Sequence, residues 1–127
     1  MSNQFKGHTG IDRIVRATSH SASGLRVAYA SESAFRQEVW LAAVLLPLSL
    51  WLGRDWVQVA LLAGSVMLVV IVELLNSSIE AAVDRVSFDW HELSKRAKDF
   101  GSAAVMLSLL SCAGIWAAAL GHRFYGV

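Results

Sequence analysis

Three long apolar segments constrain the fold of this chain more than any other feature. They cover residues 34–52, 56–75 and 100–120, and the last of them contains no charged residue. A helix needs about 20 apolar residues to cross the roughly 30 Å of hydrocarbon in a bilayer. The hydrophobic content of 55% also exceeds the roughly 45 to 50% that is usual for soluble domains. The sequence therefore predicts a single all-α membrane domain, residues 1–127, with three transmembrane helices.

The segments around the spans are expected to be helical or very short. Apolar residues recur every three or four positions in residues 11–30, which predicts an amphipathic helix on the membrane surface. Gly24 and the Ser-rich stretch 20–24 predict a break or a bend in this helix. The link 53–55 has room only for a tight turn, so the first two spans should be antiparallel. The second span is expected to remain helical to about residue 86.

The positive charges are unevenly distributed. Five of the 11 Lys and Arg residues lie in residues 1–38, and four lie in residues 76–99. Short cytoplasmic loops are enriched in these residues, which predicts a cytoplasmic N-terminus and a C-terminus outside. The first 30 residues lack the apolar core of a cleavable signal peptide. A net charge of +1 without a basic run indicates no nucleic-acid partner, and the single Cys112 excludes a disulfide framework.

Two weaker patterns concern helix packing. Ala113, Ala117 and Gly121 recur every four residues, a spacing that lets helices approach closely but also arises by chance in an Ala-rich segment. Tryptophans near the ends of spans more often form an interfacial belt than a binding site. These tryptophans are Trp40, Trp51, Trp56 and Trp116.

A polar stripe interrupts the end of the second span. At about 100° per residue, three carboxylates, one amide and one hydroxyl fall within about 60° of the Glu73 position. They belong to Glu73, Asn76, Ser77, Glu80 and Asp84. Ionisable groups beside lipid are costly and usually line a site or a polar interface. Three spans are expected to be too few to cover such a stripe, which predicts a homo-oligomer with the stripe against a neighbouring subunit.

The depth of Glu73 suggests its chemistry. Glu73 follows Trp56 by 17 residues, which places it roughly 26 Å along the hydrocarbon core, near the cytoplasmic boundary. There a lipid hydroxyl would meet a water-soluble donor, and a partly desolvated carboxylate makes a good general base. Glu80 and Asp84 continue the same face toward the cytoplasm, where carboxylate oxygens suit a hard cation such as Mg²⁺.

Two further charged clusters are expected at the same boundary, so that three carboxylate-bearing helix ends converge there. Glu32, Arg36 and Glu38 open the first span. The other cluster precedes the third span, where cations could hold phosphate, and consists of His91, Glu92, Lys95, Arg96, Lys98, Asp99 and Ser102. The sequence has neither a GxxxxGK[ST] nor a GxGxxG pattern, so any use of ATP requires a different construction.

Other readings of the stripe are a polar seam between oligomer helices and the ion path of a small channel or transporter subunit. A conduction path should continue through the middle of the bilayer. Between Val59 and Val72, however, only Ser65 is polar. The sequence therefore favours a site at the membrane boundary over a pore.

Three stretches closely resemble the bacterial membrane diacylglycerol kinase family. They are ESAFRQE (residues 32–38), VMLVVIVELLNSSIEAAVDR (residues 66–85) and HELSKRAKDFGSAAV (residues 91–105). The resemblance extends from Ile11 to about Trp116. It implies a three-span homotrimer of the bacterial inner membrane, with active sites shared between subunits at the cytoplasmic boundary. It also implies transfer of the γ-phosphoryl group of MgATP to diacylglycerol, which makes phosphatidate.

The resemblance also implies roles for individual residues. Glu73 would be the general base that takes the proton of the lipid hydroxyl, and Asn76 would support the catalytic site. Glu32 and Glu80 would hold the Mg²⁺ that presents the phosphates. ATP would contact Glu32, Glu80, Asp89, Trp90, His91, Lys98 and Asp99. The lipid substrate would contact Arg13, Ala34, Phe35, Arg36, Gln37, Glu38, Glu73 and Ser102.

The chain departs from the family at residues 20–24, which read HSASG where relatives commonly have YSWKG. We expect His20 to stack or hydrogen bond in place of the aromatic residue and so to contact ATP. The nearest alternative activity is that of the related undecaprenol kinases, which act on a polyprenol. The richer match to the diacylglycerol branch favours diacylglycerol as the substrate.

Overall fold

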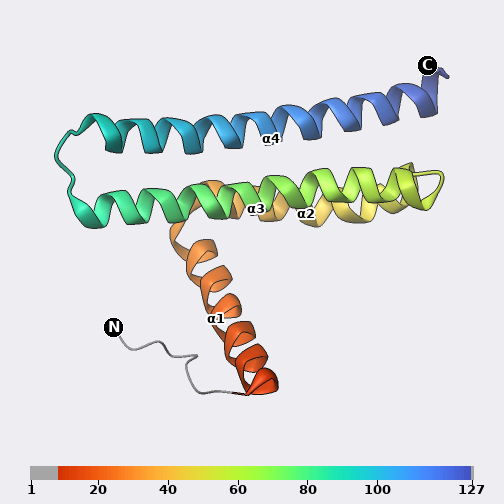
Figure 1. Ribbon diagram of the computed structural model, residues 1–127. Coiled ribbons are helices and arrows are strands. Elements are labelled where there is room, and N and C mark those ends of the chain that lie inside the picture. Colours follow the sequence, from red (N-terminus) through yellow and green to blue (C-terminus); the bar gives the residue numbers. More distant parts are fainter. Residues whose placement is uncertain (1–8, 127) are drawn as a thin grey trace.

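A computed structural model describes residues 9–126 and contains four helices (Figure 1). These are α1 (Gly10–Ser31), α2 (Ser33–Leu52), α3 (Trp56–Val86) and α4 (Glu92–Tyr125). Helices α2, α3 and α4 lie side by side, whereas α1 projects away from them at the start of α2 (Figure 1). Helices α2, α3 and α4 are each long and apolar enough to cross a membrane. The predicted all-α class is therefore confirmed.

Helix α3 is the centre of the bundle, because it packs against both α2 and α4 while those two helices barely touch each other. The apolar core joins all three helices and consists of Ala42, Leu52, Leu62, Val66 and Trp116. The indole Nε1 of Trp116 donates a hydrogen bond to the Leu62 carbonyl oxygen at 3.3 Å. The prediction that Trp116 belongs to an interfacial belt is therefore wrong, because its ring fills the space between α3 and α4.

The other three tryptophans near span ends stay exposed, as an interfacial belt requires. Trp40, Trp51 and Trp56 are exposed in the chain. The guanidinium of Arg123 lies 4.6 Å from the ring centroid of Trp51. This cation–π contact joins the end of α4 to the end of α2, where the two helices otherwise have little contact.

The small-residue ridge of α4 is not buried in the bundle, since Ala113 and Ala117 are exposed and Gly121 is half-buried. The face that packs against the core includes Cys112, Trp116 and Ala119 instead. The hydroxyl of Ser65 on α3 contacts the Cys112 sulfur at 3.5 Å. The face of α4 that meets α3 therefore combines the large Trp116 side chain with small residues such as Gly101 and Ser108.

Helix α1 continues without a break through Gly24, contrary to the predicted interruption. Its small polar side chains bond to the preceding helical turn instead of unwinding it. Thr18 Oγ1 donates to the Ile14 carbonyl at 2.8 Å, and Ser21 Oγ donates to the Ala17 carbonyl at 2.9 Å. Ile11 and Ile14 are exposed, so α1 keeps an uncovered apolar face, as expected of a helix on a membrane surface.

The tight turn predicted between α2 and α3 is confirmed at residues 53–55. Asp55 caps α3, because its Oδ1 accepts a hydrogen bond from the backbone N of Gln58 at 2.9 Å. Position 53 requires glycine, because its backbone lies very close to Val59. A Cβ at this position would lie 2.5 Å from Val59 Cγ2 and 2.9 Å from the Val59 backbone N. The turn therefore brings α2 and α3 together only if residue 53 has no side chain.

We predict that Gly53→Ala destabilises the fold by about 1 to 3 kcal/mol, the usual cost of overpacking. The backbone N of Val59 cannot move aside as a flexible side chain could. Unfolding by SDS in mixed micelles measures the loss. Gly114→Ala is the control, because a Cβ at position 114 meets no atom within 4 Å. Equal stabilities of the two variants would contradict the packing of this turn.

Candidate functional site

The polar stripe of α3 lies toward α2 and α4. Glu73 is only 6% exposed, and Asn76, Ser77, Glu80 and Asp84 are half-buried. The expectation that three helices cannot cover such a stripe is therefore wrong for Glu73. Helices α2 and α4 lie on two sides of α3 and exclude solvent from that carboxyl group within one chain. The burial of Glu73 is thus no argument for an oligomer.

Glu38 of α2 brings a second carboxyl group to Glu73. The two side chains are close enough to interact directly. Oε2 of Glu38 is buried, and no residue within 9–126 provides it with a hydrogen-bond partner. A buried polar atom without a partner is costly. This position therefore favours a ligand that offers a hydroxyl or another donor.

Asn76 connects the stripe to α4. Its Nδ2 donates to Glu80 Oε1 at 3.4 Å. Its Oδ1 is buried, has no hydrogen-bond partner within the described part of the chain, and lies against Gly101 of α4. The Asn76 amide thus contacts both the Glu80 carboxylate on its own helix and Gly101 on α4.

Further toward the α3–α4 loop, Lys98 Nζ bonds to Asp84 Oδ1 at 2.8 Å. Lys98 lies outside the apolar segment 100–120, and this hydrogen bond raises the pKa of its ammonium group above the ordinary value. The predicted partner in nucleotide binding, Asp99, bonds to Lys95 at 2.6 Å. Both Lys98 and Asp99 therefore have protein partners that a nucleotide would have to replace or share.

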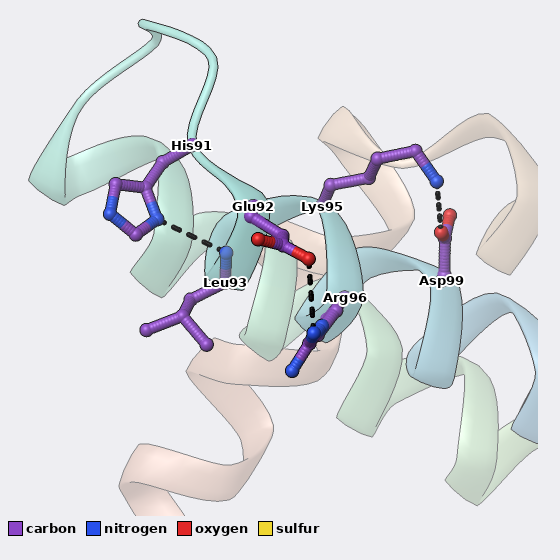
Figure 2. A network of polar contacts seen from close by, with 6 residues as sticks. All are labelled: His91, Glu92, Leu93, Lys95, Arg96 and Asp99. Atoms are coloured by element: carbon purple, nitrogen blue, oxygen red, sulfur yellow. Dashed lines mark hydrogen bonds and ion pairs between the residues drawn. The ribbon is translucent and has the colours of Figure 1, made fainter.

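The start of α4 carries a network of short-range polar contacts (Figure 2). His91 Nδ1 accepts a hydrogen bond from the backbone N of Leu93 at 3.1 Å and so caps the helix. Arg96 bonds to Glu92 at 3.0 Å one turn along. These contacts hold the loop end in place. They also engage two of the cations that the sequence suggested for phosphate, since Lys95 bonds to Asp99 and Arg96 to Glu92.

Some of the residues expected around the nucleotide lie together in space, whereas Glu32, Glu80 and His20 lie outside this group. One cavity of about 390 Å³ lies between the α3–α4 loop and the first turns of α4. Its lining includes Asp89, Trp90, His91, Lys98 and Asp99. The cavity combines an aromatic ring with a lysine, the groups that suit a base and a phosphate.

Glu32 stands at the corner between α1 and α2. Arg36 Nη1 donates to the carbonyl oxygens of Tyr29 at 2.9 Å and Ala30 at 3.3 Å. The indole of Trp40 donates to the Tyr29 hydroxyl at 3.0 Å. Sequence reasoning missed Tyr29, because its contacts cross the corner between α1 and α2, where helical spacing gives no guide. These contacts hold Glu32 beside α3.

A second cavity, of about 500 Å³, lies between α1 and α3 and is lined by Glu32, Ser31, Ser77 and Ser78 among others. The charges of Glu32 and Glu80 both act on Glu73. Within residues 9–126, no three His, Cys, Asp or Glu side chains form a metal-sized cluster. The carboxyl groups thus extend from Glu32, at the corner between α1 and α2, to Glu73 and Glu80 on α3.

The remaining predicted site residues lie apart from these two cavities. Arg13 and His20 are on the exposed surface of α1. Ala34, Gln37 and Ser102 are also exposed. Phe35 is only 2% exposed and packs inside the chain.

Comparison with known proteins adds independent findings. A family model described as prokaryotic diacylglycerol kinase matches residues 19–120. A diacylglycerol kinase of Escherichia coli strain K12 is 47% identical over 116 residues, which cover 91% of this chain and 95% of that protein. One of Pseudomonas aeruginosa is 48% identical over 91% of this chain and 94% of its own length. One of Haemophilus influenzae is 44% identical, with 85% and 92% covered.

Proposed function

Because the chain belongs to the prokaryotic diacylglycerol kinase family and is therefore a lipid kinase, we propose that it transfers the γ-phosphoryl group of ATP to the hydroxyl of diacylglycerol. The product would be phosphatidate. The observation that carries this proposal is the buried carboxyl group of Glu73, which stands where the apolar part of α3 changes to its polar part. Lipid and nucleotide can meet at such a point.

Glu73 acts as the general base in this proposal. As the hydroxyl oxygen of the lipid bonds to the γ-phosphorus, Glu73 takes the hydroxyl proton. The bond from the γ-phosphorus to the bridging oxygen of ATP breaks, and ADP leaves. Phosphoryl transfer depends mainly on positioning and charge stabilisation, which suits a site without a covalent nucleophile. Glu38 supports the role, since its partnerless oxygen can accept a hydrogen bond from a glycerol hydroxyl.

Glu32 and Glu80 are proposed to hold Mg²⁺. Carboxylate oxygens fit this cation, and Mg²⁺ usually takes only one or two of them, completing its shell with water and phosphate. Two carboxylates on neighbouring elements therefore suffice, even though no cluster of three forms within the described residues. When bound, Mg²⁺ would neutralise charge on the ATP phosphates. Asn76 keeps Glu80 oriented through the bond from its Nδ2.

The nucleotide is proposed to occupy the cavity beside the α3–α4 loop. The Lys98 ammonium group, which now donates to Asp84, would also donate to a phosphate oxygen of the nucleotide. Asp99 would contact the same nucleotide. His20 would approach from α1. The lipid would contact Arg13 of α1, residues 34–38 of α2 and Ser102 of α4.

The family and the apolar helices are consistent with a bacterial membrane protein. Within this setting we propose an inner-membrane protein whose N-terminus and active site face the cytoplasm and whose C-terminus lies outside. We further propose a single kinase domain over residues 1–127 and a homotrimer with shared sites. The distribution of Lys and Arg supports the orientation.

Transfer of labelled phosphate from ATP tests the activity. Purified protein in mixed micelles is given Mg²⁺, ATP and either diacylglycerol or undecaprenol. The proposal expects label in phosphatidate and a much lower rate with undecaprenol. Preferential labelling of undecaprenol would show that undecaprenol, not diacylglycerol, is the substrate. No labelling of either lipid would contradict the assignment as a lipid kinase.

For the base, we predict that Glu73→Gln lowers kcat by about 10² to 10⁴, the usual contribution of a general base. The amide keeps the size of the side chain but cannot take the proton. ATP binding, followed by a fluorescent analogue, should change little. Glu92→Gln is the control, because Glu92 is exposed, pairs with Arg96 and does not line the cavity beside the α3–α4 loop. Near-normal kcat in Glu73→Gln would show that another group accepts the proton.

For the metal site, we predict that Glu80→Gln raises the Mg²⁺ concentration needed for half-maximal activity by about tenfold or more, because one carboxylate ligand is lost. The measurement is a Mg²⁺ titration at fixed ATP. An unchanged Mg²⁺ dependence would remove Glu80 from the metal site.

A further inference from the structure

Gly101 is a buried glycine inside α4 whose backbone does not require glycine. Within the described residues, the only positive φ belongs to Gly126. A glycine in a helix interior costs about 1 kcal/mol relative to alanine. Something other than backbone conformation must therefore favour glycine at position 101.

The Asn76 amide occupies the space that a side chain at position 101 would fill. A Cβ at Gly101 would overlap Asn76 Oδ1 and would lie 3.2 Å from Asn76 Cγ. The third nearest atom, at 3.8 Å, is the Cβ of Asn76. All three contacts belong to one side chain. The absence of a side chain at position 101 therefore makes room specifically for Asn76.

The same amide has a defined orientation. Its Nδ2 faces Glu80 Oε1 at 3.4 Å, and its Oδ1 faces Gly101. Turning the amide over would bring two oxygen atoms together at Glu80 and lose the hydrogen bond. A methyl group at position 101 would push Oδ1 away from α4 and rotate Nδ2 away from the carboxylate.

We propose that Gly101 is a positioning residue, which holds the Asn76 amide against α4 and through it orients the Glu80 carboxylate toward the metal. The orientation of Glu80 toward the metal rests on the proposed role of Glu80. The contact between Gly101 and Asn76 concerns only the packing of α3 against α4. Contact between these two helices is thereby linked to the metal site.

The first test is a thermal double-mutant cycle. Gly101→Ala should lower the Tm in mixed micelles, because the methyl group overlaps Asn76. In the Asn76→Ala background the same change should raise the Tm, since the space is open and alanine favours the helix. Gly114→Ala is the control and should behave alike in both backgrounds, because its Cβ meets no atom within 4 Å.

The second test is metal binding, measured by electron paramagnetic resonance with Mn²⁺ and a non-hydrolysable ATP analogue. Gly101→Ala should weaken Mn²⁺ binding about tenfold, the usual effect of losing a group that orients a ligand. It should also raise the half-saturating Mg²⁺ in the kinase assay, with a smaller effect on kcat at saturating Mg²⁺. Gly114→Ala should leave both values unchanged.

An equal change in Tm in the two backgrounds would overturn the contact with Asn76. If the change in Tm reverses sign between the two backgrounds but Mn²⁺ binding is unchanged, the link from Gly101 to Glu80 is overturned. If Gly101→Ala cannot be purified, recovery of folded protein in Gly101→Ala/Asn76→Ala supports the proposal, and no recovery contradicts it. Neither Tm nor Mn²⁺ binding needs a lipid substrate, so failure of diacylglycerol phosphorylation by the unchanged protein would be a separate result.

Discussion

The burial of the Glu73 carboxyl group in the three-helix bundle is the constraint on which the other features depend. An ionisable group at the edge of the hydrocarbon is costly if it faces lipid. Helices α2 and α4 must therefore cover two sides of α3, and they do so with groups that suit a polar neighbour. Helix α2 supplies the carboxyl of Glu38 beside Glu73, and α4 supplies the bare backbone of Gly101 beside Asn76. The residual exposure of Glu73 is only 6%.

Helix α3 combines two environments in one element. Its 31 residues extend roughly 46 Å at about 1.5 Å each, well beyond a hydrocarbon core of about 30 Å. The part around Leu62 and Val66 packs in the apolar core, and the part after Glu73 carries amide and carboxylate groups. The excess length continues past the start of α2 toward the α3–α4 loop (Figure 1). A lipid site and a nucleotide site can thus share one rigid helix.

The sequence predicted those features that depend on local composition. Span number, the turn at residues 53–55 and the grouping of the stripe on one helical face follow from hydropathy, chain length and helical periodicity. The core position of Trp116 and the contact of Gly101 with Asn76 could not be predicted, because α4 is apolar on nearly every side and does not reveal which face meets α3. The same missing information explains why Glu73 was not expected to be buried within one chain. Pairing of Lys98 with Asp84 depends on that docking as well.

The central claim is that the lipid hydroxyl is held at Glu73 and the neighbouring Glu38. Photo-crosslinking tests it most directly, with a diacylglycerol that carries a diazirine on an acyl-chain carbon close to the ester carbonyl, followed by mass spectrometry of the labelled peptides. The claim predicts adducts on Glu38 and Glu73 that decrease when unlabelled diacylglycerol is added. Adducts confined to the opposite end of the bundle, around Trp51 and Arg123, would contradict it.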